Sequence, residues 1–257
     1  MRKLLNILLL VFTLASLIAL SVYFIYDHFH NSLENVEITI IRDGENGFVD
    51  YGKTYDKVVD ICDTANNNQI FMIPVDSVVN MLNANPWIVD VDAEINLKSV
   101  LDIEITECQP VMRVYNTQGK SVYLDSEGNV FPTNNSHVKH LLVGSGYVKF
   151  PINQLGNIAD EDYADTDLPD MYRLMKAVLA DDYARNCVKQ IYKDNKKNYI
   201  FSLNITNIIV IFGEINDIGE KLAKMQIFFD KMQGNPELEK YKEINLNYKN
   251  QVVCTKK

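Results

Sequence analysis

The chain has 257 residues, 47% of them hydrophobic, and a formal net charge of −9 at pH 7. This length and composition suffice for one or two domains with a buried core and exclude an intrinsically disordered protein. The acidic balance argues against a nucleic-acid-binding protein, because neutralising phosphates needs a basic face. The cysteines lie far apart and form no CxxC pair, so they predict neither a disulfide framework nor a zinc site; they are Cys62, Cys108, Cys187 and Cys254.

The chain begins with a short basic head, residues 1–3, and an apolar segment, residues 4–26, that carries no charge. As a helix this segment is long enough to cross the hydrocarbon core of a bilayer, which is about 30 Å thick. A cleaved signal peptide is the alternative, but the apolar run extends past the roughly 7–15 residues of a signal-peptide core. Arg2 and Lys3 precede the segment, and no Lys or Arg follows it before Arg42. By the positive-inside rule, the head is then cytoplasmic and the rest of the chain lies outside.

A strand and two helices are predicted next. Residues 35–41 (NVEITII) have the composition of a strand, and residues 44–51 that of a loop. Thr54 is predicted as the N-cap of one helix, and Pro74 as the start of another. Apolar residues recur at helical spacing in both, at Tyr55, Val58, Val59 and Cys62 and then at Val75, Val78, Val79 and Leu82.

Residues 85–113 predict a β-hairpin followed by a joint. Apolar and polar residues alternate with period two on both sides of a break at Lys98-Ser99, which predicts two half-buried strands. The residues expected on the buried faces are Trp87, Val89, Val91, Ala93, Ile95 and Leu97, then Leu101, Ile103 and Ile105. Pro110 has no N–H for a central ladder, so we expect a domain boundary there. Together these elements predict an α+β fold with two helices on one face of a small sheet.

This part of the sequence resembles a known family. Pro86-Trp87-Ile88 with the alternating valines, Glu107-x-x-Pro110 and Asp125-x-Glu127-Gly128 are similar to the end of the POTRA domain and the next hairpin of the FtsQ/DivIB family. These are bacterial cell-division proteins with one membrane span. The resemblance implies a POTRA domain (strand, helix, helix, strand, strand) over residues 34–108 and an FtsQ-type β domain over residues 109–257.

Beyond Pro110 the sequence predicts a β-rich domain with flanking helices. Strands are expected at residues 111–115, 121–125, 130–132, 187–192, 198–204 and 208–213, and a short buried strand or a turn at residues 141–144. One helix follows the acidic stretch 160–170, and its buried face contains Met171, Leu174, Met175 and Val178. A longer helix covers residues 218–232 and ends at Gly234-Asn235-Pro236. An alternating segment, residues 244–248, and a last strand, residues 251–254, complete the domain.

The C-terminal part extends the resemblance. Phe212-Gly213-Glu214, Lys221-Leu222 and residues 244–248 look like the family's Leu-Gly, Lys-Leu and Asp-Leu-Arg-Tyr signatures. Asn245 and Asn247 stand where the family's acid and Arg usually are, so no role that rests on that pair is carried over. Two further positions depart from the pattern, because Glu94 and Leu97-Lys98 replace the Arg and Trp-Pro of many members.

The sequence carries no complete catalytic or metal-binding motif. Ser136-x-x-Lys139 matches the S-x-x-K pattern of penicillin-binding proteins but lacks the partner S-D-N and K-T-G motifs. His137 and His140 have no third metal ligand at a useful spacing. The acidic stretch 160–170 lacks the glycine and terminal glutamate of an EF-hand. We therefore predict a protein that is not an enzyme and has no catalytic residue, cofactor or metal site.

The last strand is the predicted partner-binding site. A terminal strand often has an unpaired edge, which another chain can extend by β-augmentation, although it can also be interior or covered. The resemblance favours the open edge, because family members bind the single-span division proteins FtsB and FtsL through the end of this domain. The residues predicted to contribute are Tyr248, Asn250, Gln251, Val252, Val253 and Cys254, with Lys221, Lys224 and Lys231 expected to be exposed on the helix behind them.

The predicted function is a non-catalytic scaffold of bacterial cell division. It would be anchored in the inner (cytoplasmic) membrane at the division site, with its domains on the periplasmic side, and would hold FtsB-like and FtsL-like partners but no nucleic acid or small-molecule substrate. Two alternatives stay open. A POTRA-containing secretion or envelope-assembly component would be favoured by repeated POTRA units or barrel strands, which the sequence does not show. A membrane-anchored wall enzyme is opposed by the missing motifs.

Overall fold

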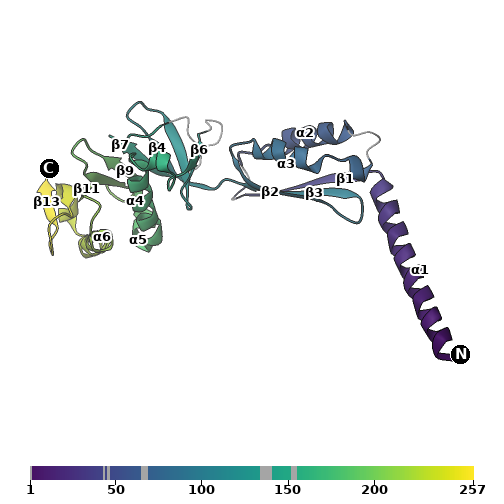
Figure 1. Ribbon diagram of the computed structural model, residues 1–257. Helices are drawn as coiled ribbons and strands as arrows, with labels where there is room; N and C mark the ends of the chain where they lie inside the picture. Colours follow the sequence, from purple (N-terminus) through teal and green to yellow (C-terminus); the bar gives the residue numbers. More distant parts are fainter. Residues whose placement is uncertain (1, 43, 45–46, 65–68, 134–140, 152–154) are drawn as a thin grey trace. The chain divides into compact units, whose positions relative to one another are not determined.

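The computed structural model describes residues 2–42, 44, 47–64, 69–133, 141–151 and 155–257 (Figure 1). The chain divides into two compact units, Met1–Glu107 and Cys108–Lys257. Both units combine helices with sheet, and the second is richer in strands, so the fold is α+β.

The first unit begins with the helix α1, Arg2–His30. Its stretch Asn6–His28 is long and apolar enough to cross a membrane, and none of the window that meets this test is buried against the protein. A single such helix is found in the described part of the chain, which fits one membrane span near the N-terminus.

The rest of the first unit is a three-stranded sheet with two helices on one face (Figure 1). The elements are β1 (Asn35–Ile41), α2 (Tyr51–Asp63), the 3₁₀ turn η2 (Ile70–Met72), α3 (Val75–Asn83), β2 (Ile88–Ile95) and β3 (Val100–Glu107). The strand order is β1-β3-β2, with β3 parallel to β1 and antiparallel to β2. The predicted helical and strand periodicities meet in one core, which includes Val58, Val78, Leu82, Leu101, Ile103 and Ile105.

Three predictions in this unit are wrong in detail. Helix α2 starts earlier than predicted, because Asp50 and not Thr54 is its N-cap: the Asp50 carboxylate accepts the N–H of Lys53 at 2.9 Å. An extra residue in β2 shifts the register between Ile88 and Asp90, so Ile88 is buried and Val89 exposed. Leu97 lies in the hairpin turn beyond the end of β2 and is 90% exposed.

The second unit is built on a ten-stranded sheet whose order is β13-β12-β11-β10-β9-β7-β4-β5-β6-β8. Its strands are β4 (Pro110–Tyr115), β5 (Ser121–Asp125), β6 (Asn129–Pro132), β7 (Leu142–Gly146), β8 (Gly156–Asn157), β9 (Val188–Lys193), β10 (Tyr199–Leu203), β11 (Ile209–Gly213), β12 (Tyr241–Asn245) and β13 (Val253–Lys256). The pairs β4/β7, β7/β9 and β11/β12 are parallel and the others antiparallel. Pro110 is the first residue of β4, where its missing N–H breaks no interior rung of the ladder.

Helices complete the core of the second unit. They are α4 (Leu168–Ala180), α5 (Asp182–Cys187) and α6 (Ile218–Met232), with short 3₁₀ turns η3 (Glu161–Tyr163) and η4 (Pro236–Lys240). The predicted apolar face of α4 is fully buried, and Phe229 of α6 is almost completely buried. Both helices pack into the same cluster as the central strands β9, β10 and β11, so one continuous core connects the two ends of the sheet.

Candidate functional site

The strand β13 forms one end of the ten-stranded sheet and pairs only with β12 in the described part of the chain. The register pairs Asn245 with Val253 and Glu243 with Thr255. On its other side, β12 is bound through Leu246, whose N–H donates to Ile211 O at 3.0 Å. Backbone N–H and C=O groups alternate in direction along a strand. Those of Glu243 and Asn245 therefore point toward β13, and those of Val253 and Thr255 point toward β12.

The N–H and C=O groups of Cys254 and Lys256 therefore point away from β12, toward the open side of the strand. Within the described residues, neither N–H has a hydrogen-bond acceptor. The unpaired groups of an edge strand are where another extended chain can add. This open edge, Val253–Lys256, is the candidate functional site.

The predicted site residues lie at and before this edge. The strand is Val253–Lys256 and not 251–254, so only Val253 and Cys254 of the predicted set lie in it. Tyr248 is 48% exposed and lies, with Asn250 and Gln251, in the turn that leads into the strand; Asn250 has a positive φ of 60°. The sequence-based prediction ended the strand at residue 254 and therefore missed Thr255 and Lys256.

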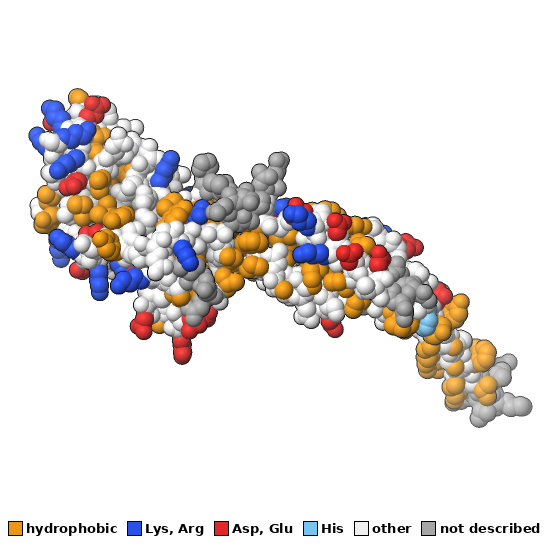
Figure 2. Space-filling model, turned by 90° about the horizontal axis from the view of Figure 1, so that it is seen from above, with side chains coloured by type: hydrophobic (Ala, Val, Ile, Leu, Met, Phe, Trp, Pro, Cys, Tyr) orange, Lys and Arg blue, Asp and Glu red, His pale blue; other side chains and the backbone are white. Residues whose placement is uncertain are grey.

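A groove runs between α6 and this turn. Its volume is about 490 Å³, and the residues that line it are Glu220, Ala223, Lys224, Ile227, Phe228, Lys231, Asn250, Gln251 and Val252. Ile227 is exposed on α6, so the groove offers apolar surface beside the open edge. Lys and Arg side chains gather on the C-terminal part of the chain on the face shown in Figure 2.

The lysines of α6 differ from one another. Lys231 is exposed, as predicted. Lys224 is largely covered: its ammonium donates to Leu246 O at 2.9 Å and to Tyr248 O at 3.1 Å, and lies 3.6 Å from the Glu220 carboxylate. These hydrogen bonds tie the start of the turn to α6.

The prediction that Lys221 is exposed is wrong. The residue is only 4% exposed, and its ammonium donates to Glu214 O at 2.8 Å and to Asn216 Oδ1 at 2.6 Å. Burial, with Lys224 nearby, lowers the pKa of the Lys221 amine. Its position on the apolar stripe of α6 carries the side chain inward, where the loop after β11 satisfies the charge. Lys221 therefore holds that loop and offers no charge to a partner.

Two residues of the family pattern are structural. The Glu107 carboxylate is buried, accepts the N–H groups of Phe48 and Val49, and lies 3.9 Å from the Arg42 guanidinium. The Asp125 carboxylate accepts Glu127 N at 2.9 Å, Asn129 N at 2.8 Å and Asn129 Nδ2 at 2.8 Å, which shapes the β5–β6 hairpin. Both carboxylates are buried and satisfy backbone N–H groups of a nearby loop or turn.

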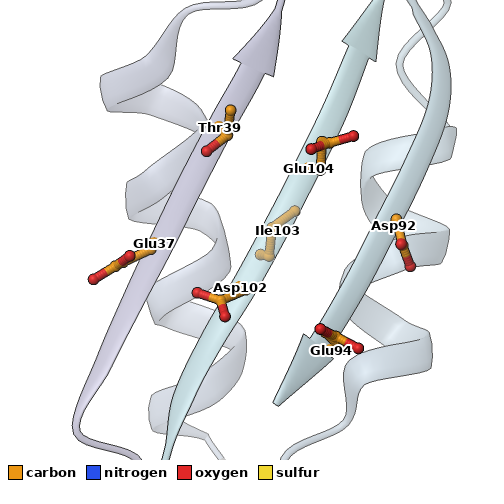
Figure 3. A pocket seen from close by; sticks show the side chains of 7 residues that line it. All are labelled: Glu37, Thr39, Asp92, Glu94, Asp102, Ile103 and Glu104. Carbon is orange, nitrogen blue, oxygen red and sulfur yellow. The ribbon is translucent and has the colours of Figure 1, made fainter. Parts of the chain in front are cut away.

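The solvent face of the first unit carries a row of acids. Figure 3 shows them on the side of the sheet turned away from the helices. The register places Asp102 between Glu37 and Glu94, and Glu104 between Thr39 and Asp92. They line a shallow hollow of about 230 Å³. Like charges face one another across the neighbouring strands of this surface, which is unfavourable without solvation. Among the described residues, no group of three or more His, Cys, Asp and Glu side chains could hold a metal ion.

Three of the six acids in the stretch 160–170 have structural partners. Asp160 accepts Asn157 N at 2.8 Å, Asp167 pairs with the buried Lys193, and Asp170 accepts the hydroxyl of Tyr199 at 3.3 Å. Ser136, Lys139, His137 and His140, which were considered above for catalysis and metal binding, lie outside the described residues.

A protein-family model described as FtsQ/DivIB, C-terminal related, matches residues 109–255, more than half of the chain and nearly all of the second unit. The chain belongs to the FtsQ/DivIB family. Among curated proteins, none matches. The FtsQ/DivIB family implies a role in cell division, and it is a scaffold type of family and not a known enzyme family. The matched region ends within β13, so it includes most of the open edge.

Proposed function

We propose that this protein is a bitopic scaffold of the bacterial divisome that binds other single-span division proteins through the open edge of β13. The observation that carries the proposal is the edge itself: the N–H groups of Cys254 and Lys256 point outward from the end of a ten-stranded sheet. An extended segment of an FtsB-like partner would add there as an eleventh strand, and an FtsL-like protein would join through that partner.

The proposed organisation follows the family. Residues 1–3 form a cytoplasmic head, residues 4–26 cross the inner membrane, residues 34–108 are a POTRA domain, and residues 109–257 are the FtsQ-type β domain on the periplasmic side. The order strand, helix, helix, strand, strand with β3 in the centre of the sheet supports the POTRA assignment. Anchoring confines the domains to the membrane surface at the division site, which raises the effective concentration of anchored partners.

The side chains around the edge would supply specificity. Tyr248 is an exposed aromatic residue beside the edge, and aromatic anchors dominate many interfaces. Asn250, Gln251 and Val252 line the groove next to α6, and Val253 is partly exposed on the strand. A partner segment that pairs with β13 would place side chains against these residues.

The edge can be tested with a proline that removes one outward N–H. In Lys256→Pro the lost donor faces away from β12, and proline is tolerated at such positions of an edge strand. The full chain, reconstituted in nanodiscs, is titrated with the extracytoplasmic segment of the FtsB-like protein of the same organism. We expect saturable binding to the unchanged chain and at least a tenfold weaker affinity for Lys256→Pro.

Two control variants separate the ladder from the side chain and from the fold. Lys256→Ala removes the ammonium but keeps the N–H, so it should retain binding within about threefold. Thr255→Pro removes an N–H that faces β12 and should weaken both the strand pairing and the binding. If Lys256→Pro keeps the circular dichroism spectrum and full affinity, the partner does not pair with this edge. If the unchanged chain does not bind the segment at all, the scaffold proposal fails.

A further inference from the structure

The turn η2 is attached to the end of the membrane helix. Ile70 N donates to Asn31 O at 3.0 Å, and Ser32 and Gln69 form an isolated β-bridge. The ring of Phe71 lies 5.1 Å from the ring of His30, which itself stacks on Tyr26 at 3.9 Å. Backbone and aromatic contacts thus hold η2 beside the last turn of α1.

This turn has a buried side and an apolar exposed side. Ile70 and Ile73 are buried and fix the segment to the first unit. Between them, Phe71 is 48% exposed and Met72 is 47% exposed. Two adjacent large apolar side chains that face outward on a well-attached turn are unfavourable in water, so they indicate a contact surface.

The position along α1 identifies the surface. The stretch that can cross the membrane ends at His28, and His30 follows it by two residues, about 3 Å along a helix axis. The headgroup region on each side of a bilayer is roughly 5–8 Å deep. Because Phe71 contacts His30, its ring lies within the depth of this region when α1 spans the membrane.

We propose that Phe71 and Met72 insert into the outer face of the lipid bilayer at the boundary of headgroups and acyl chains. The occupant is the membrane itself, because Phe71 contacts His30, whose ring stacks on Tyr26 at the end of the apolar stretch of α1. An aromatic ring and a flexible thioether suit this boundary, which is apolar at one end and wet at the other. The first unit then has two contacts with the membrane, and the second restricts how it can turn about the end of α1.

Fluorescence of the full chain can test this, because it contains a single tryptophan, Trp87. Trp87 lies at one end of β3, because the next residue, Ile88, pairs with Glu107. The other end of β3 lies near α1, because Val100 pairs with Asn35. Those two ends of β3 are about 23 Å apart. The natural tryptophan therefore reports on the membrane-distant end of the same unit.

The variant Phe71→Trp is made in the Trp87→Phe background and reconstituted in phosphatidylcholine vesicles that contain lipids brominated near the carbonyl end of the acyl chain. We expect at least half of the fluorescence of the indole at position 71 to be quenched by the brominated lipid and little by aqueous iodide. The chain with its natural Trp87 should show the reverse. Adding Met72→Asp to the position-71 variant should reduce the lipid quenching at least twofold.

If Phe71→Trp does not fold, the same quenching measurement is made on Met72→Trp in the Trp87→Phe background. Circular dichroism and the protease pattern of the unchanged chain serve as the test of folding. Iodide quenching at both positions equal to that of Trp87, with no effect of the brominated lipid, would overturn the proposal. The turn would then face water or another protein and not the membrane.

Discussion

The two ends of the ten-stranded sheet treat their outward backbone groups in opposite ways. At one end, the outer strand β8 has only two residues. Ile158 N donates to Gly128 O at 2.9 Å, so the backbone N–H and C=O of the preceding residue, Asn157, point outward. Both of its groups are already bonded: Asn157 N donates to the Asp160 carboxylate at 2.8 Å and Asn157 O accepts Asp160 N at 2.9 Å. At the other end, Cys254 and Lys256 of β13 face outward without such a turn.

This difference shows that the chain can close a sheet edge with one short acidic turn and does so at one end only. Open edges carry a risk of uncontrolled pairing with other chains, and proteins usually protect them. An edge that stays open while the opposite edge is protected supports the proposal that a partner pairs with β13.

The largest effect is expected at the centre of the sheet, which both ends share. Gly146 has a positive φ of 98°, and a side chain there would collide with the backbone of Lys193 on the neighbouring strand β9. Gly146→Ala should lower the free energy of unfolding by roughly 3 kcal/mol or more, because a strained backbone and a steric clash add. Urea unfolding followed by circular dichroism measures this, and partner binding at the β13 end should fall with it.

Gly119→Ala is the matched control for Gly146→Ala. Gly119 also has a positive φ, 77°, but a side chain there would meet no atom within 4 Å. Its substitution should cost only about 1 kcal/mol from the backbone conformation. Equal losses in the two variants would mean that the close approach of β7 and β9 does not matter.

The closed end should be breakable without loss of the partner site. Asp125→Ala removes the acceptor of three hydrogen bonds in the β5–β6 hairpin, next to β8. We expect roughly 2–3 kcal/mol less stability, because the buried acceptor of three part-buried hydrogen bonds is lost. Affinity for the FtsB-like segment should change less than twofold under conditions where the variant is folded.

Asp125→Asn is the milder control at the closed end. The amide keeps an oxygen that can accept the two backbone N–H groups, so about 1 kcal/mol is expected. A strong loss of partner affinity in either folded variant would show that the two ends are not independent.

The open end should lose affinity when its leading turn is released. Lys224→Met keeps the apolar stem but removes the donors to Leu246 O and Tyr248 O. We expect about 1 kcal/mol less stability and a three- to tenfold weaker affinity for the partner, since the turn before β13 becomes less ordered. The comparison variant is Lys231→Met on the same helix, whose exposed side chain should affect stability by less than about 0.5 kcal/mol.

Most elements of the fold could be predicted from the sequence, because periodicity reports which face of an element is buried. Strand β1 and the apolar face Leu101, Ile103 and Ile105 were predicted correctly. The errors arose where a local hydrogen bond or an irregularity decides the outcome. Asp50 and not Thr54 is the N-cap of α2, and the bulge in β2 buries Ile88 in place of Val89 while Val91, Ala93 and Ile95 keep the predicted face.

The candidate site was harder to predict than the fold. An alternating pattern says which side chains are buried but not which strand is outermost, because pairing is set by residues distant in sequence. The family resemblance pointed to the end of the domain, yet the predicted strand, residues 251–254, stopped short of Lys256. Lys221 was misjudged because a lysine on an apolar stripe can have its charge satisfied by carbonyl groups inside the fold.

The smallest predicted effect is kinetic and concerns Cys254 on the open strand. Three of the cysteines are buried, whereas Cys254 is partly exposed. Partial burial raises the pKa of the Cys254 thiol above its ordinary value of 9.0. The reactive thiolate is therefore scarce near neutral pH, and alkylation by iodoacetamide should speed up about tenfold per pH unit up to and beyond pH 9.

Mass spectrometry of the native chain should find Cys254 alkylated first, and the FtsB-like segment should slow that reaction severalfold, because a strand added to β13 covers its open side. If alkylation of Cys254 is equally fast with and without a saturating segment, the partner binds away from β13. If a saturating segment protects Cys254 in Lys256→Pro as well as in the unchanged chain, the segment covers the edge without using the N–H of residue 256.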